Sequence, residues 1–537
     1  MHFPGGYPRL TLSVTLPYEA RTFLTRIPFG MTARDRSVWL RGLLYHKSFS
    51  LSTQLYPKPL LTFGKFYDII TMYCYVIIKV RIFYMKVGFV SLGCPKNQLD
   101  TEVMLHHVAS AGYEITPDET EADIVIINTC AFIESAKKEA IDNILDIAWL
   151  KKHKDLKAII VTGCMAERYG REILDEFPEV DAVLGVGSIH NIVEAIESCV
   201  ANAGKKRKKN APDCRYYSHE DKNTVRLGGD RVLTTPDYAA YLKISEGCDN
   251  RCTYCAIPDI RGKFRSRPMD ELVREARELD EMGIKELTVI AQDTTRYGKD
   301  LYGEYCLDKL LHRITEETNI PWIRVLYCYP DKMTDGLIEE MKNNPRILNY
   351  IDLPLQHISD NVLRRMNRHG RSAEIRELLA KLRREIPGVV IRTTFIVGFP
   401  GESEQDFIEL CEFVKEQKFA RVGVFTYSRE EGTPAASFPD QIDEQVKQDR
   451  MDIIMRSQID ISEQYLKDHV GKAINVICED YDTVSECYFG RSEGDAPEID
   501  GKVFFESEEK IMPGEFVKVK VRRVLDYDMY GFAMKKA

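Results

Sequence analysis

The stretch of sequence that decides the fold is YAAYLKISEGCDNRCTYCAIPDIRGKFRSRP, at residues 238–268. It opens with an apolar strand and continues into a short loop that carries Cys248, Cys252 and Cys255 in the spacing C-x-x-x-C-x-x-C. Three thiolates on one loop can bind three irons of a cubane iron–sulfur cluster and leave the fourth iron open. Zinc sites also use short cysteine spacings, so the spacing alone is only moderately specific.

The position of this motif after a first strand resembles the signature of the radical-SAM superfamily. Tyr254, directly before the third cysteine, is typical of that superfamily and makes zinc the weaker interpretation. The resemblance implies a 4Fe-4S cluster whose open iron chelates the amino and carboxylate groups of S-adenosyl-L-methionine. It also implies that GFPGE, at 398–402, supports the adenine part of that cofactor, which makes Gly398 and Glu402 candidate cofactor-binding residues.

Strand-like and helical segments alternate through residues 236–466 and predict a central (β/α)6 partial TIM-like barrel. In such barrels the chemistry lies at the carboxyl ends of the strands, where polar side chains can hold the cofactor. Each such residue is equally common as a simple turn residue, so these are candidates only. The strand-end candidates are Gln292, Asp293, Gln356 and His357, and Thr393, Thr394, Tyr427 and Ser428 occupy equivalent positions.

A second set of cysteines lies upstream, where strand–helix repeats from Met85 predict a doubly wound parallel sheet. Cys94, Cys130 and Cys164 each follow the carboxyl end of a strand, which is the ligand-binding edge of open α/β sheets. Three thiols there suit a cubane cluster with one open iron, or zinc with an open position. The alternative is three buried structural cysteines, since free cysteine is commonly buried. Cys306, Cys328 and Cys411 lack cluster spacing and are predicted to be structural.

After a helical stretch at 446–471 the pattern changes to short strands separated by turns, which predicts a small β-barrel. Its main basic group is opposed by many carboxylates, which weakens an RNA-binding interpretation. That group comprises Lys518, Lys520, Arg522 and Arg523.

The bulk composition is that of an ordinary globular protein with a net charge of -9 and 14 cysteines, too few for a disulfide scaffold. We find no secretory signal peptide, so the cytoplasm is the expected compartment. The apolar segment Ile69–Ile78 is shorter than the roughly 20 residues that span a bilayer, and no membrane association is expected.

Two three-cysteine sets followed by a small β domain resemble the methylthiotransferases, and the resemblance covers Met85 to Ala537. It implies two 4Fe-4S clusters and S-adenosyl-L-methionine as cofactors. It also divides the chain into an N-terminal cluster domain at 85–203, a linker at 204–235, a radical-SAM domain at 236–466 and a TRAM-like domain at 467–537. Cys94, Cys130, Cys164, Cys248, Cys252 and Cys255 are then the metal ligands.

One branch of this family modifies an adenosine in transfer RNA, and another modifies an aspartate on ribosomal protein S-twelve. SLGCPKNQLD at 91–100 and GRSEGDAPEIDG at 490–501 resemble the second branch, whereas the first usually has a T-x-G-C-Q-M-N form. The expected reaction is therefore methylthiolation of an aspartate β-carbon, with the small-subunit protein or the ribosomal subunit as partner and a reducing electron donor. Transfer RNA is the alternative substrate.

Two interpretations from other functional classes are weaker. A two-cluster electron carrier usually ligates each cluster with four cysteines, whereas this chain supplies three at each site. A zinc-bearing nucleic-acid-binding module is disfavoured by the acidic charge balance.

Residues 1–84 form an atypical basic extension without helical or strand periodicity, whereas the rest of the chain is acidic. Our hypothesis is that translation starts at Met85, and the alternative is a targeting or regulatory extension. N-terminal sequencing of the native protein is expected to begin at Met85. A native peptide from an earlier position contradicts the hypothesis.

Overall fold

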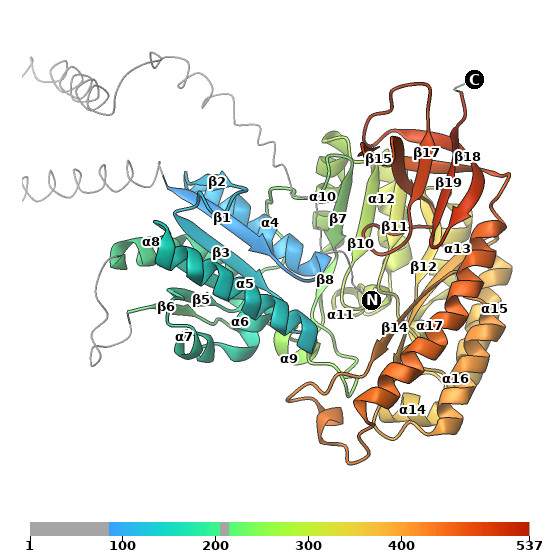
Figure 1. Ribbon diagram of the computed structural model, residues 1–537, viewed down its shortest axis with the longest axis horizontal. Coiled ribbons are helices and arrows are strands. Elements are labelled where there is room, and N and C mark those ends of the chain that lie inside the picture. Colours follow the sequence, from blue (N-terminus) through green and yellow to red (C-terminus); the bar gives the residue numbers. More distant parts are fainter. Residues whose placement is uncertain (1–84, 204–213, 536–537) are drawn as a thin grey trace, which may run out of the picture.

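The computed structural model describes residues 85–203 and 214–535 (Figure 1). Its strands form two six-stranded sheets, a closed C-terminal barrel and a two-stranded ribbon. The predicted fold class is confirmed: a doubly wound parallel sheet, a (β/α)6 partial barrel and a small β-barrel follow one another along the chain. The predicted extension at 1–84 and the start of the predicted linker at 204–213 lie outside the described residues. The domain boundaries remain predictions.

The N-terminal sheet has the order β2-β1-β3-β4-β5-β6, and all its neighbouring strands are parallel. Alternate residues of β3 face two different hydrophobic cores: Val125 packs on the side of α5, and Ile126 on the side of α4 and α8. Helices therefore cover both faces, which explains why every residue of β3 and β4 is buried. The strands are β1 (Lys86–Ser91), β2 (Glu114–Thr116), β3 (Ile124–Thr129), β4 (Ala158–Gly163), β5 (Ala182–Leu184) and β6 (Tyr216–Ser218). The helices are α4 (Pro95–Ser110), α5 (Glu134–His153), α6 (Cys164–Tyr169), α7 (Glu172–Glu176), η1 (Val186–Asn191) and α8 (Ile192–Asn202).

The central sheet has the order β14-β13-β12-β11-β10-β7, and its strands are parallel and consecutive along the chain. The strands are β7 (Ala239–Lys243), β10 (Glu286–Ile290), β11 (Trp322–Val325), β12 (Ile347–Asp352), β13 (Val390–Val397) and β14 (Arg421–Thr426). The ribbon is β8 (Ser245–Glu246) with β9 (Arg265–Ser266). The long helices are α10 (Met269–Glu281), α12 (Leu307–Glu317), α13 (Asp335–Asn343), α15 (Ser372–Glu385), α16 (Glu404–Gln417) and α17 (Glu444–Lys467). Shorter helices are α9 (Ile257–Arg261), η2 (Thr294–Arg296), α11 (Lys299–Tyr302), η3 (Pro330–Lys332), α14 (Asp360–Arg365) and η4 (Pro434–Ser437).

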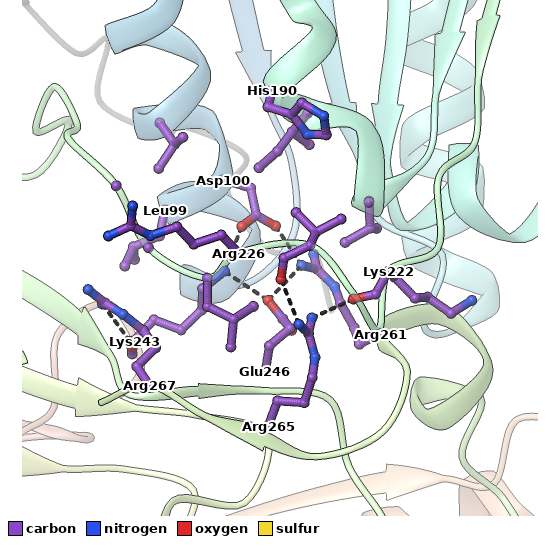
Figure 2. A pocket seen from close by; sticks show the side chains of 18 of the residues that line it. Leu99, Asp100, His190, Lys222, Arg226, Lys243, Glu246, Arg261, Arg265 and Arg267 are labelled. Atoms are coloured by element: carbon purple, nitrogen blue, oxygen red, sulfur yellow. Dashed lines mark hydrogen bonds and ion pairs between the residues drawn. The ribbon is translucent and has the colours of Figure 1, made fainter. Parts of the chain in front are cut away.

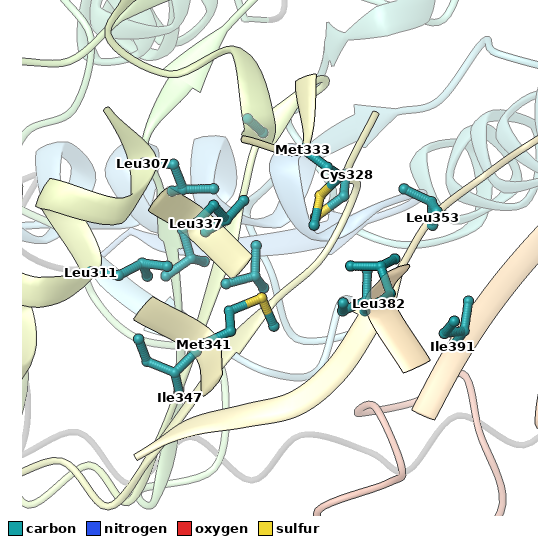
Figure 3. Packing of buried hydrophobic residues seen from close by; sticks show 14 of the residues in the cluster. Leu307, Leu311, Cys328, Met333, Leu337, Met341, Ile347, Leu353, Leu382 and Ile391 are labelled. Carbon is teal, nitrogen blue, oxygen red and sulfur yellow. The ribbon is translucent and has the colours of Figure 1, made fainter. Parts of the chain in front are cut away.

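The apolar faces of these helices pack on the outside of the central sheet and form the largest core of the molecule (Figure 3). Leu311 of α12 and Met341 of α13 lie in this core beside Ile347 of β12. Cys328 and Cys306 are buried in the same core, as expected for structural cysteines. Within 85–203 and 214–535, no helix is long and apolar enough to cross a membrane.

The C-terminal barrel is closed in the order β15-β16-β17-β19-β18. It is tied to the first residue of β10, because Glu286 accepts hydrogen bonds from Arg491 at 2.6 Å and from Arg324 at 2.8 Å. Arg491 belongs to the GRSEGDAPEIDG segment, and Asp500 of the same segment accepts a hydrogen bond from Tyr350 at 2.6 Å. The strands are β15 (Ala473–Asp482), β16 (Cys487–Ser492), β17 (Val503–Glu506), β18 (Phe516–Leu525) and β19 (Asp528–Ala533).

Breaking this buried contact is expected to destabilise the protein. Glu286→Ala leaves Arg324 buried without its carboxylate, and removing one partner of a buried ion pair costs about 3–5 kcal/mol. The exposed pair of Lys467 and Glu463 provides the control, because Glu463→Ala should change stability by less than about 1 kcal/mol. The thermal unfolding midpoints of Glu286→Ala and Glu463→Ala are compared. Equal midpoints would contradict a stabilising role of the contact at Glu286.

The same contact predicts a direction of pH dependence. Burial opposes ionisation of Glu286, but Arg491 and Arg324 outweigh it and hold its pKa at about 2, below the ordinary 4.5. The stability that this carboxylate contributes is therefore complete above pH 4.5 and is lost as the pH falls toward 2. The difference between wild type and Glu286→Ala should shrink over that window in pH-dependent unfolding; a difference that grows on acidification would contradict the assignment.

Candidate functional site

The three upstream cysteines lie at one edge of the N-terminal sheet, as the sequence predicted. Cys94 is the N-cap of α4 after β1, Cys130 directly follows β3, and Cys164 opens α6 directly after β4. Because β1, β3 and β4 are adjacent in the sheet and parallel, their carboxyl ends bring the three loops together.

Two glycines allow these loops to approach closely. A Cβ at Gly93 would lie 3.1 Å from Cys130 Sγ, and one at Gly163 would lie 2.2 Å from Asn128 Oδ1. Both glycines also have a φ near +90°, which other residues rarely adopt. Asn128 completes the packing by donating a hydrogen bond to the carbonyl of Asn97 at 2.8 Å. The two loops are therefore so close to their neighbours that neither Gly93 nor Gly163 can carry a side chain.

The upstream thiols are buried enough to need a cationic partner when ionised. Burial raises the pKa of Cys164 to about 12 and also raises the pKa of Cys130. No three His, Cys, Asp or Glu side chains in the described part of the chain stand close enough to surround a single metal ion. A cubane cluster does not require three side chains around one ion, because each of its thiolates binds a separate iron. Three thiols at adjacent strand ends therefore fit such a cluster.

The second set of cysteines lies on a loop that other parts of the barrel hold in place. Cys255 N donates to Cys252 O at 3.0 Å, and Thr253 N donates to Met366 O at 3.0 Å. Asn250 Nδ2 donates to Asp293 Oδ2 at 2.7 Å. Burial raises the pKa of Cys248 to about 11 and raises that of Cys255 as well. The loop is thus held by hydrogen bonds to the barrel, and its three cysteines are buried or half-buried.

Asp293 is fully engaged in this support. Besides Asn250, it accepts a hydrogen bond from Thr295 Oγ1 at 2.9 Å and pairs with Lys332 at 3.2 Å. Its side chain is completely buried. Asp293 therefore supports the cysteine loop, and its role in binding the cofactor stays a prediction.

The GFPGE segment lies beside the cysteine loop. The ring of Tyr254 meets the ring of Phe399 edge-on at 6.5 Å between centroids. Gly398 has a φ of +71°, and a Cβ there would collide with Lys447 Cγ at 2.2 Å. Glu402 accepts a hydrogen bond from Arg450 at 2.9 Å, yet burial still raises its pKa to about 7. The structure therefore brings Tyr254, Gly398 and Glu402 into one region.

The remaining predicted cofactor residues lie at neighbouring strand ends. Gln292 donates to Glu246 at 2.6 Å, and its Oε1 is a buried acceptor without a partner among the described residues. Gln356 has a φ of +70°, and its Oε1 is likewise unpartnered in the described ranges. His357 is fully buried; its Nδ1 accepts from Ser359 N at 3.0 Å, and burial lowers its pKa to about 3.

Arg261 of the barrel domain contacts the upstream cysteine set, and Figure 2 shows it beside Asp100. It ends α9, which begins two residues after Cys255, and its Nη2 donates to Cys164 Sγ at 3.3 Å. The same guanidinium donates to Asn97 at 2.9 Å and to Asp100 at 2.5 Å, both on α4. A side chain of the barrel therefore reaches into the cysteine edge of the other sheet.

A buried charge cluster surrounds Arg261 and borders a cavity of about 410 Å³ (Figure 2). Lys243 donates to Asp100 at 2.6 Å and to Glu246 at 2.9 Å. Since Glu246 also accepts from Gln292, a continuous chain of polar contacts runs from Cys164 to a predicted cofactor residue. In this cluster the positive charges of Lys243 and Arg261 are compensated by the carboxylates of Asp100 and Glu246.

Sequence reasoning missed Arg261 and also Lys96 and Tyr327. Lys96 lies two residues after Cys94 and is 8% exposed, with its Nζ 3.1 Å from the centroid of the Tyr327 ring. Burial lowers the pKa of Lys96, and Cys94 opposes that shift. Arg261 and Lys96 stand inside quoted motifs, so their proximity to cysteines was a usable signal. Tyr327 carried none, because its positive φ of +62° is visible only in the structure.

Three family models match successive parts of the chain. Residues 86–185 match the Uncharacterized protein family UPF0004, residues 242–414 match the Radical SAM superfamily, and residues 470–534 match the TRAM domain.

Curated relatives match over nearly their whole length. The ribosomal protein uS12 methylthiotransferase RimO of Desulforamulus reducens is 51% identical over 83% of this chain and 99% of that protein. The protein of the same name from a Thermoanaerobacter species is 49% identical over 83% and 99%. Among solved structures, the radical S-adenosylmethionine methyltransferase TsrM from Kitasatospora setae gives a TM-score of 0.48 at 13% identity, over 65% of this chain and 77% of that one. That similarity is too weak to carry an argument.

Removing the Arg261 cation should change the electrochemistry of the upstream set. In protein reconstituted with iron and sulfide, with Cys248, Cys252 and Cys255 replaced by alanine, Arg261→Gln is expected to lower the midpoint potential of the remaining cluster. The reason is that the guanidinium beside Cys164 favours the more negative, reduced state.

A redox titration followed by electron paramagnetic resonance measures this effect. Arg261→Lys should retain most of the parent potential, and Arg376→Gln, on the exposed face of α15, serves as the control. An unchanged or higher potential in Arg261→Gln would show that Arg261 does not act on this site.

Proposed function

Because the chain belongs to the RimO family of ribosomal protein uS12 methylthiotransferases, we propose that it adds a methylthio group to the β-carbon of an aspartate on uS12. It is a radical-SAM methylthiotransferase. The observation that carries the proposal is the contact of Arg261 with Cys164. Arg261 follows the cysteine loop of the barrel domain, so this contact places the two sets of three cysteines on either side of one junction between the domains. A single-cluster enzyme has no need of that arrangement, and a two-cluster electron carrier usually ligates each cluster with four cysteines rather than three.

We propose that each cysteine set binds one 4Fe-4S cluster. Cys248, Cys252 and Cys255 would hold the cluster that binds S-adenosyl-L-methionine, and the upstream set would hold the second. Support comes from the donor chemistry, since both sets consist of thiols on close loops without a fourth cysteine. When bound, the two clusters and S-adenosyl-L-methionine supply the electron, the 5′-deoxyadenosyl radical and the methylated sulfur.

The residues of the chain would then bind, orient and shield these groups. Gln292 Oε1 and Gln356 Oε1 are buried acceptors without partners in the described structure, so each can accept a hydrogen bond from the cofactor. Tyr254, Gly398 and Glu402 lie together and would support its adenosine part, whereas His357 and Asp293 would position loops. The burial of this region would exclude water from a reactive radical.

The proposed substrate also bears on location and partners. Since uS12 is a ribosomal protein, we propose that the enzyme acts in the cytoplasm, on the free protein or the ribosomal subunit. A reducing electron donor is also required for the radical-SAM cluster. The domain boundaries predicted from the sequence are proposed as the functional units of the chain.

Methylthiolation of transfer RNA is the second candidate, and one observation points toward it. On the outer face of the C-terminal barrel, Arg522 lies 4.1 Å from the ring centroid of Phe532 and Arg523 lies 4.5 Å from that of Tyr530. Such interleaved basic and aromatic side chains can bind nucleic acid. Relatives about 50% identical over most of the chain nevertheless carry the uS12 name, which favours the protein substrate.

Anaerobic reconstitution followed by mass spectrometry tests the proposed reaction. The wild type should add a methylthio mass to uS12 in a reaction that depends on S-adenosyl-L-methionine. Cys94→Ala should abolish that product yet retain some cleavage of S-adenosyl-L-methionine, because the two cysteine sets would have separate roles.

Cys411→Ala is the matched control, since this half-buried cysteine lies in neither set and should not affect the product. If neither uS12 nor transfer RNA gains the mass, the proposed function is wrong. If transfer RNA alone gains it, the second candidate replaces the first.

A further inference from the structure

Lys96 places a buried ammonium group beside the upstream cysteines, and no carboxylate in the described part of the chain forms an ion pair with it. It stands in the first turn of α4 and is 8% exposed. Throughout 85–203 and 214–535, its Nζ makes no hydrogen bond or ion pair, and its close contact is the face of the Tyr327 ring at 3.1 Å. Contact with an aromatic ring replaces only part of the hydration that a buried ammonium group loses. This position therefore favours binding of a ligand that carries an anionic group.

The carboxylates nearest to this space are already engaged elsewhere. Asp352 accepts from Tyr327 N at 2.9 Å through Oδ2 and from Arg392 at 2.7 Å through Oδ1. Asp100 is held by Lys243 and Arg261, and Glu246 is held by Lys243 and Gln292. Within 85–203 and 214–535, these three carboxylates therefore have other partners and form no ion pair with Lys96.

Tyr327, whose ring contacts Lys96, has an unfavourable backbone conformation. Tyr327 follows β11 at the carboxyl edge of the barrel with a φ of +62°, which is rare for a bulky side chain. The hydrogen bond from its N–H to Asp352 fixes this geometry. Strain of this kind persists where the surrounding structure holds a functional group in place. The ring thus positions the ammonium group at the junction between the two cysteine sites.

We propose that Lys96 determines substrate specificity by binding the side-chain carboxylate of the aspartate that is modified. This inference rests on the proposed function. A carboxylate would give the ammonium group the charge-assisted hydrogen bonds that it lacks, in a place shielded from water. It would also hold the adjacent β-carbon at the junction of the two cysteine sites.

A double-mutant cycle on binding tests the pairing in the full-length reconstituted enzyme. The modified aspartate is first located by mass spectrometry of the wild-type product, and uS12 is then prepared with that aspartate or with asparagine in its place. With wild-type enzyme, asparagine should weaken binding about 10- to 100-fold. With Lys96→Met, the two forms of uS12 should bind almost equally.

Two further variants separate this role from a structural one. Lys96→Arg retains the charge and should keep most of the discrimination between aspartate and asparagine. Lys138→Met, on the exposed face of α5, should leave the cycle unchanged. Because the ammonium group forms no hydrogen bond or ion pair within 85–203 and 214–535, Lys96→Met should not lower the thermal midpoint or the iron content, and it should still cleave S-adenosyl-L-methionine without modifying uS12.

The inference is overturned if asparagine weakens binding equally in wild type and Lys96→Met, or if Lys96→Met loses iron or thermal stability. Its failure is distinguishable from that of the proposed function. If wild type modifies uS12 but the cycle shows no coupling, only the role of Lys96 is wrong. If wild type does not modify uS12 at all, both fall.

Discussion

The interaction on which the rest of the site depends is the buried pairing of Arg261 with Asp100 and Cys164. Charges this deeply buried are tolerated only when their partners are present. Here Arg261 belongs to the barrel domain, whereas Asp100 and Cys164 belong to the N-terminal domain. The barrel and the N-terminal sheet therefore hold one relative position at this junction. That position sets the edge with Cys94, Cys130 and Cys164 against the loop with the other cysteines. The chemistry that needs both sites is a consequence of this fixed junction.

The C-terminal barrel stabilises the same arrangement from the other end of the strands. Glu286 begins β10 and is clamped by Arg324 and Arg491, while Gln292 and Asp293 follow the end of the same strand. The GRSEGDAPEIDG segment, which was identified from the sequence as a family motif, thus packs against the central barrel. Asp495 pairs with Arg421 of β14, and Asp500 pairs with Arg392 of β13 at 3.9 Å. One short strand connects this clamp to the predicted cofactor residues.

Much of the fold could be predicted because its signals are local. The cysteine loop follows a strand in sequence, and the upstream cysteines follow strands whose parallel order brings their ends together, so motif spacing and strand position predicted the two sets of cysteines. The contact between Arg261 and Cys164 could not be predicted, because it depends on how two sheets meet. Lys96 stood inside a recognised motif, but its role rests on the ring of Tyr327, which is distant in sequence and whose positive φ has no sequence signature. What the sequence missed are contacts between segments that only the tertiary fold brings together.

The central claim is that the chain holds two open-iron clusters facing one another across the Arg261 junction. Mössbauer spectroscopy and iron analysis of the anaerobically reconstituted wild type, with electron paramagnetic resonance of the fully reduced protein, test it most directly. The account predicts about eight irons per chain in two 4Fe-4S clusters whose reduced spins interact magnetically. Iron for a single cluster, zinc at the upstream cysteines, or two clusters without magnetic interaction would contradict it.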